Sequence, residues 1–216
     1  MRTLLIVLAA LAAASPAQAL TQPGRLEFAV TRNGSPLGSH TFVVTEEGGA
    51  LNLRERARFN VSAGPLTLFR YEHDCAMQWR NGAVERLQCS TLRDGERTRI
   101  EGARTGGQIE VRHPQGATTF DAATPPTLFI TPAALRSGSF IDTETGRARA
   151  IRITQLGRET VTIAGRAIAA QRYRVAGTIT MDVWYDAEGR WLQGEFTARG
   201  QRIQYRLTSP LEAAPR

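Results

Sequence analysis

The two cysteines of the chain, Cys75 and Cys89, have the clearest chemistry. They flank Asn81-Gly82, a strong hairpin signal, on two strands predicted to pair, and a three-residue connection can place both cysteines on one face, opposite or near each other. In an oxidising compartment this arrangement predicts a disulfide, worth about 3 kcal/mol in the loop-entropy account. Two alternatives stay open. One is a reactive thiol beside His73, and the other is a zinc site that adds His73 and His113 to the cysteines, although the spacing matches no known zinc motif.

Glu55 is the second chemically notable residue, because it falls between Leu53 and Ala57 on the apolar face of its predicted strand. A carboxylate that faces a core costs several kcal/mol unless it is paired. Arg70 is in phase to face inward and could supply a salt bridge. A sheet edge where Glu55 reaches water is the alternative, and the functional interpretation is a polar anchor inside a ligand cavity.

Asp182 and Asp186 could form a carboxylate pair for acid–base catalysis. We expect instead that Asp186 bonds the backbone of a tight turn closed by Gly189, and that Trp184 and Trp191 pair across that hairpin. These residues therefore predict structure rather than a reaction.

The remaining polar candidates have structural explanations as well. Asp142 and Glu144 have the pattern of turn residues before a strand, and His40 is isolated and expected at the surface or a rim. The chain contains no nucleophile-elbow, zinc-protease or phosphate-loop motif. We predict no catalytic residues, no metal and no cofactor.

The first 19 residues have the pattern of a secretory signal. Arg2 supplies a positive charge, Thr3 to Ala14 is an apolar run too short to span a bilayer, and Ala17-Gln18-Ala19 provides a cleavage site. We predict cleavage after Ala19 and a periplasmic protein of residues 20–216. That length is enough for one domain with a sizeable core.

The chain is basic, with 27 basic and 20 acidic residues and a formal net charge of +7. Every basic residue is Arg, which a genome rich in G and C explains, although Arg also binds phosphate and carboxylate bidentately. The Arg residues are spread along the chain and alternate with apolar residues, so nucleic acid is a poor partner. An anionic envelope partner is more plausible.

Apolar and polar residues alternate with a period of two from residue 25 to 208, interrupted by turn residues. The expected strands are 25–32, 39–45, 51–63, 67–79, 83–92, 148–156, 160–164, 167–177, 179–186, 191–199 and 202–208, with further hairpins at 94–95, 106–107 and 115–116. No strand–helix–strand rhythm occurs. We predict an all-β fold: one antiparallel, up-and-down sheet of about a dozen strands that is barrel-like or strongly curled, with two packed sheets as the alternative.

Residues 122–146 interrupt the strand pattern and are expected to form an irregular insertion. Pro125-Pro126 breaks regular structure. Thr131 can cap a short helix, with Pro132 in its first position and Gly138 at its end. Such an insertion is often a lid, a plug or a crossover.

The chain resembles a family of exported proteobacterial proteins grouped as domain of unknown function 6134, with a looser likeness to the related group numbered 3108. The residues that carry the resemblance are 79–82, 140–146, 171–173, 184–186, 189–191 and 203–207. The resemblance implies a periplasmic, antiparallel β-barrel-like domain and no known catalytic residues.

Together these features predict a non-catalytic periplasmic protein that binds a lipophilic or amphipathic envelope molecule, such as a lipid, under a cover formed by residues 122–146. The candidate ligand-binding residues are Glu55, Phe59, Tyr71, Trp79 and Phe129. The alternatives are a structural or interaction module that contacts an anionic envelope partner and, with least support, an envelope hydrolase. After cleavage we expect no membrane span.

Overall fold

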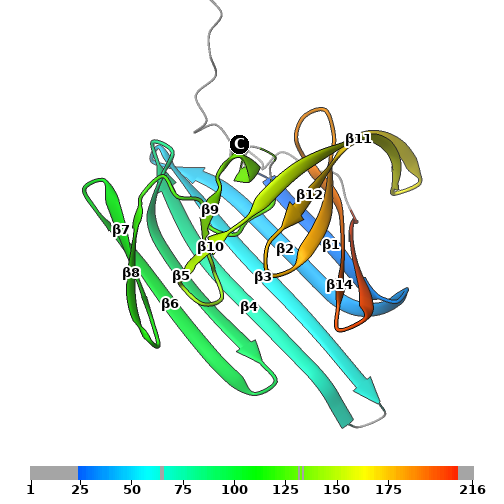
Figure 1. The fold of residues 1–216 in the computed structure, drawn as a ribbon, viewed down its shortest axis with the longest axis horizontal. Coiled ribbons are helices and arrows are strands. Elements are labelled where there is room, and N and C mark those ends of the chain that lie inside the picture. Colours follow the sequence, from blue (N-terminus) through cyan, green and yellow to red (C-terminus); the bar gives the residue numbers. More distant parts are fainter. Residues whose placement is uncertain (1–23, 64–65, 131, 133, 209–216) are drawn as a thin grey trace, which may run out of the picture.

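A computed structural model of the chain describes residues 24–63, 66–130, 132 and 134–208 (Figure 1). The predicted signal peptide and its cleavage site therefore lie outside the described residues. No helix in the described part of the chain is long and apolar enough to cross a membrane.

The first half of the chain is a continuous meander of eight antiparallel strands. They are β1 (Gly24–Arg32), β2 (Ser35–Glu47), β3 (Ala50–Ala63), β4 (Leu66–Arg80), β5 (Ala83–Arg93), β6 (Glu96–Thr105), β7 (Gln108–His113) and β8 (Gly116–Asp121). Figure 1 shows these strands, in blue to green, as one broad curved surface.

The second half adds five more strands to the same sheet: β11 (Arg152–Ile163), β12 (Arg166–Ala176), β13 (Thr180–Tyr185), β14 (Trp191–Ala198) and β15 (Gln201–Leu207). The two meanders join where β15 pairs with β1, and β8 and β11 form the two edges of the 13-stranded sheet. The prediction of a curled, antiparallel, all-β sheet is thus confirmed, and the sheet is open rather than closed.

Tight turns at Asn-Gly and Asp-Gly dipeptides join neighbouring strands, and bulges shift the register beyond two of these turns, between Val30 and Thr31 and between Gln78 and Trp79. Asn33-Gly34, Asn81-Gly82 and Asp94-Gly95 have positive φ at both residues. That backbone conformation is the one that two-residue turns between right-twisted strands require. The break expected between the strands 148–156 and 160–164 is not found, because β11 runs straight through Gly157 and a register shift between Gln155 and Gly157 absorbs the extra residue as a bulge.

The insertion crosses from one sheet edge to the other and fills the interior. Its strand β9 (Ser139–Ile141) pairs with β10 (Ala148–Ala150), which follows the insertion. The strand expected over 148–156 is therefore divided: its first three residues pair with β9, and β11 begins at Arg152. The buried apolar residues of the insertion join the core cluster of the sheet; they are Leu128, Ile130, Leu135, Phe140 and Ile141. The insertion is therefore both a crossover and a plug.

The helix expected in the insertion is not found. The described residues contain only a 3-10 turn, η1 (Ala134–Arg136), and Thr131, its proposed cap, lies outside them. Backbone bonds tie the segment to its surroundings instead, from Thr127 to Ile141 and from Val84 to Ala122. These bonds satisfy groups that a helix would otherwise pair internally.

Candidate functional site: an interior cavity with a buried histidine–glutamate cluster

A cavity of about 210 Å³ lies between the inner face of the curled sheet and the insertion. Both meanders and the insertion contribute to its wall. Six aromatic residues line it: Phe42, Tyr71, Phe129, Trp191, Phe196 and Tyr205. The cavity therefore has an apolar body of aromatic rings.

A polar cluster from three adjacent strands also lines this cavity. His40 on β2, Glu55 on β3 and His73 on β4 are its members. His40 Nε2 lies 2.8 Å from Glu55 Oε1, and His73 Nδ1 lies 2.8 Å from the Thr91 hydroxyl. Glu55 and His73 are both more than nine-tenths buried.

Strand register explains why these side chains meet. His40 and His73 both pair with Ala57, one on each side of β3, and Glu55 is the next inward-facing residue along that strand. Inward-facing residues on neighbouring strands lie within reach of one another along the diagonals. The small side chain of Ala57 leaves space between the two imidazoles.

The cluster leaves three buried polar atoms without a hydrogen-bond partner: His40 Nδ1, Glu55 Oε2 and His73 Nε2. His73 Nε2 and Glu55 Oε2 are 3.8 Å apart, which is too far for a hydrogen bond. Most buried polar atoms in proteins do have partners, so three unpartnered atoms at one cavity indicate that water or a ligand completes the site.

Glu55 is ionised in this environment. Burial opposes ionisation, but the hydrogen bond from His40 and the positive charge that His73 and His40 carry in acid together lower the pKa of Glu55 below its ordinary value. The cavity therefore contains a buried carboxylate with one oxygen unpaired.

Two hydroxyl groups hold the insertion against opposite meanders. Tyr71 on β4 donates a hydrogen bond of 2.9 Å to Glu144, which also receives one from Arg93 on β5. Tyr185 on β13 donates a bond of 2.6 Å to the carbonyl of Phe129. Burial raises the pKa of both tyrosines, so they stay protonated and able to donate.

The five residues predicted to bind a ligand separate into two groups. Glu55, Tyr71 and Phe129 line the cavity. Phe59 stacks on Tyr71 with ring centroids 5.4 Å apart and packs against the core from there. Trp79 is buried in the core near the β4–β5 turn. Ligand binding by these residues stays a prediction.

Two expectations about the partners of Glu55 were wrong. Arg70 faces away from the interior and pairs with Glu72, because Tyr71 and His73 take the inward positions of β4. His40 is not isolated but is the direct partner of Glu55. The hairpin turn at Gly48-Gly49 would have revealed this neighbour, since it fixes the β2–β3 register.

Cys75 and Cys89 form the predicted disulfide between β4 and β5, where they are directly paired. Both sulfur atoms are consumed in that bond. His73 lies within 4.8 Å of them, but disulfide sulfurs are not thiolate ligands or nucleophiles. The thiol and zinc alternatives are therefore wrong.

The two acidic candidates near the β13–β14 turn serve separate structural roles. Asp186 accepts backbone hydrogen bonds from Glu188 and Arg190, as predicted for a turn. Asp182 pairs with Arg174 and Arg172, which hold its pKa below the ordinary value despite partial burial.

The expected pairing of Trp184 with Trp191 was wrong, because the two indoles belong to opposite faces of the sheet. A register shift between Trp184 and Tyr185 places Trp191 opposite Tyr185. Trp184 bonds Glu159 and lies under the guanidinium of Arg172, whereas Trp191 packs against Phe28.

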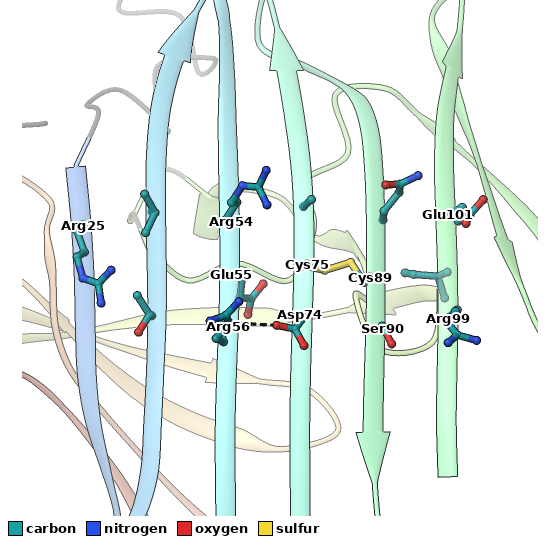
Figure 2. Close-up of a pocket in the computed structure, with 15 residues that line it drawn as sticks. Arg25, Arg54, Glu55, Arg56, Asp74, Cys75, Cys89, Ser90, Arg99 and Glu101 are labelled. Atoms are coloured by element: carbon teal, nitrogen blue, oxygen red, sulfur yellow. Dashed lines mark hydrogen bonds and ion pairs between the residues drawn. A yellow bond between two sulfur atoms is a disulfide. The ribbon is translucent and has the colours of Figure 1, made fainter. Parts of the chain in front are cut away.

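A second hollow, of about 580 Å³, lies on the outer face of β1 to β6, and it shares β2, β3 and β4 with the inner cavity. Figure 2 shows its labelled charged residues on β1, β3, β4 and β6, with the Cys75–Cys89 bond joining β4 to β5. Its outward side chains include four guanidiniums and two carboxylates: Arg25, Arg54, Arg56, Arg99, Asp74 and Glu101. The hollow is open to solvent and is bordered by these charged groups.

These features define an open, curled antiparallel sheet wrapped around a plugged interior with a small cavity. The chain belongs to the family of domain of unknown function 6134 (DUF6134), whose profile matches residues 28–208. The chain is also similar to a crystal structure described as a β-barrel-like protein of domain of unknown function DUF1849 from Brucella abortus. That similarity has a TM-score of 0.64 at 12% identity and covers 88% of this chain and 98% of the other.

The structural similarity establishes a shared fold and nothing more at this level of identity. A comparison with curated proteins finds no match.

Proposed function

We propose that this protein binds a small lipophilic or amphipathic molecule of the cell envelope in its interior cavity, and that it does so in the periplasm without catalysis. One observation carries the proposal: a cavity walled by aromatic rings also holds buried polar atoms that lack partners. A mostly apolar pocket with a few convergent polar groups is typical of small-molecule sites.

The size of the cavity limits the ligand. Its volume of about 210 Å³ is below the ~300–1,000 Å³ of pockets for drug-sized ligands. Ile179, in the β12–β13 connection, lines the cavity and is nonetheless exposed, so it marks a mouth. We infer that the ligand is either a short molecule that the cavity encloses completely or a longer one whose apolar tail extends out of the mouth at Ile179.

Two features support the periplasmic location. Residues 1–19 have the charge, apolar core and small-residue site of a secretory signal. The Cys75–Cys89 disulfide is the kind of bond that persists in oxidising compartments and is rare in the cytosol.

Binding is tested on the protein expressed from its full sequence, including the predicted signal peptide of residues 1–19, and recovered from the periplasm. Native mass spectrometry after incubation with an envelope lipid extract should show a bound molecule. Met181→Trp, which fills the cavity from its wall, should abolish the added mass, and Arg54→Ala on the outer face should not. Equal binding by the wild type and Met181→Trp would refute the cavity as the site.

Location is tested by cell fractionation and by the mass of the recovered protein. A periplasmic product that begins at Leu20 is expected. An intracellular product that retains residues 1–19 would contradict the proposal.

A second candidate function is contact with an anionic envelope partner through the outer hollow. The observation that favours it is the excess of guanidiniums over carboxylates there. Retention on envelope fractions should then fall steeply with salt, because exposed charges are screened within about 8 Å at physiological ionic strength. Retention that is lost in Met181→Trp but kept at high salt would favour the cavity instead.

A further inference from the structure

The hydrogen-bonding character of the unpartnered atoms specifies the ligand further. In the neutral form, each imidazole has one N–H and one lone pair. His40 Nε2 faces a carboxylate oxygen, which only accepts, so this nitrogen carries the hydrogen and His40 Nδ1 presents a lone pair.

The Thr91 hydroxyl does not fix the tautomer of His73, because at 2.8 Å it can either donate to Nδ1 or accept from it. His73 Nε2 has no partner in the described part of the chain, and it presents a lone pair when the hydrogen is on Nδ1. Glu55 Oε2 and the Nδ1 atom of neutral His40 are acceptors with either tautomer of His73.

The charge of the cavity wall agrees with that result. The wall contains three carboxylates, from Glu55, Asp142 and Glu144, and one guanidinium, from Arg149. Asp142 is paired with Arg149, and Glu144 with Arg93 outside the wall. Glu55 is thus the one wall carboxylate without a guanidinium partner, inside a chain whose net charge is +7.

We propose that the cluster of His40, Glu55 and His73 recognises the ammonium group of an amphipathic amine, whose apolar part points toward Ile179. This inference rests on the proposed function. An ammonium group has three donors and no acceptor, which matches Glu55 Oε2 and His40 Nδ1, with His73 Nε2 as a third acceptor when the hydrogen of His73 is on Nδ1. A hydroxyl has a single donor and can satisfy only one of these acceptors.

The aromatic wall provides a second attraction for a cation. The ring centroid of Tyr71 lies 6.3 Å from that of His73, and the ring centroid of Phe42 lies 4.3 Å from that of His40, so aromatic rings border the cluster. A cation within about 6 Å of a ring centroid is stabilised by the ring quadrupole, and more strongly when it is desolvated. An anionic head group would meet the buried carboxylate and be excluded.

A divalent cation fits the cluster less well. The one group of three ligand atoms within 4.8 Å among the described residues is that of His73 with the two disulfide cysteines. His40, Glu55 and His73 do not form such a group. Zinc is therefore an outcome for the experiment to separate rather than the expected ligand.

The test compares three probes with the same tail on the full chain: hexylamine, hexanol and hexanoate, measured by calorimetry in phosphate buffer near neutral pH. Hexylamine should bind about tenfold or more tightly than hexanol, since a charge-assisted bond distinguishes them, and hexanoate should bind most weakly. Hexanol binding as tightly as hexylamine would overturn the ammonium assignment and leave the proposed function standing. No binding of any probe would count against both.

Variants then locate the head group. Glu55→Gln keeps the shape of the side chain, removes its charge and should lower hexylamine affinity about tenfold while leaving hexanol affinity unchanged. Asp74→Asn is the matched control, because it removes a carboxylate from the outer face of β4, next to His73 in sequence. Equal losses in the two variants would overturn the assignment. The assignment would also be overturned if zinc raised the melting temperature of the wild type but not of Glu55→Gln, and hexylamine raised neither.

Discussion

The two hollows of this protein share strands β2, β3 and β4, yet they place charge in opposite settings. On the inner face, Glu55 is buried with one oxygen unpaired, and the wall is acidic. On the outer face, Arg54 and Arg56 border an open hollow with more guanidiniums than carboxylates. Residues one position apart therefore experience different dielectric surroundings.

The comparison teaches where specificity can come from. An unpaired polar atom in a low-dielectric interior lowers the stability of the fold considerably. A ligand that forms the missing hydrogen bond gains a correspondingly large binding free energy. Exposed ion pairs such as Arg56–Asp74 gain little, because water and salt screen them. Changes on the inner face should have large effects on stability and binding, and changes on the outer face should have small ones.

The largest expected loss is at the aromatic centre of the interior. Phe28 is fully buried, and the centroid of its ring lies 4.2 Å from the ring centroid of Trp191. Phe28→Ala should lower the free energy of unfolding by about 3–5 kcal/mol in urea titrations, because it leaves a cavity. Arg54→Ala, on the outer face, should stay within about 0.5 kcal/mol. Similar losses in both would mean that the two faces do not differ as described.

The disulfide is the next most important interior feature. Cys75→Ala/Cys89→Ala should cost about 3 kcal/mol, because the bond closes a short loop in the unfolded chain. Ser90→Ala, at the neighbouring outward-facing position, is the control. A double variant as stable as the wild type would show that the disulfide contributes no stability beyond that of the paired strands around it.

Removing one tether of the insertion should have a smaller effect. Tyr71→Phe loses the hydrogen bond to Glu144, and bonds to charged groups contribute about 1.5–3 kcal/mol. Amide hydrogen exchange should speed up in residues 122–150 more than in β1 and β2. Uniform acceleration along the chain would mean that the tether stabilises the fold as a whole and not the plug.

Acid should affect the inner carboxylate in a defined direction. The pKa of Glu55 is lowered in the folded state from an ordinary value of 4.5, so its ionised form stabilises the fold above that pH, and this contribution is lost as the pH falls through the folded value. Between about pH 5 and pH 3 the wild type should lose more stability than Glu55→Gln. The extra loss should be about 1.4 kcal/mol for each unit by which the pKa of Glu55 in the folded state lies below its value in the unfolded state. Parallel melting curves across that range would contradict the lowered pKa.

The smallest effect is expected for the outer ion pair. A double-mutant cycle of Arg56→Ala and Asp74→Ala should give a coupling energy of about 0.2–1 kcal/mol that falls with added salt. A coupling of several kcal/mol that does not depend on salt would show that the outer hollow is effectively buried and would end the contrast between the faces.

Local features of the sequence determined much of the fold. Two-residue turns such as Asn81-Gly82 adopt the left-handed backbone that joins twisted strands, and period-two alternation assigned the inner and outer faces. Alternation placed Glu55 on the inner face, and the turn brought the strands of Cys75 and Cys89 together. The direct pairing of the two cysteines also needed a bulge between Gln78 and Trp79, which neither the turn nor the alternation predicted.

Other features were decided only by the tertiary structure. The pairing of β15 with β1, the open edges at β8 and β11, and the path of the insertion across the interior all join distant segments. The approach of His73 to Glu55, and the outward direction of Arg70, follow from the register of β3 and β4, which shifts between Val61 and Ser62. A shift of one residue in that register would move each side chain to the opposite face, so alternation predicts that a strand has two faces but not which neighbours meet across them.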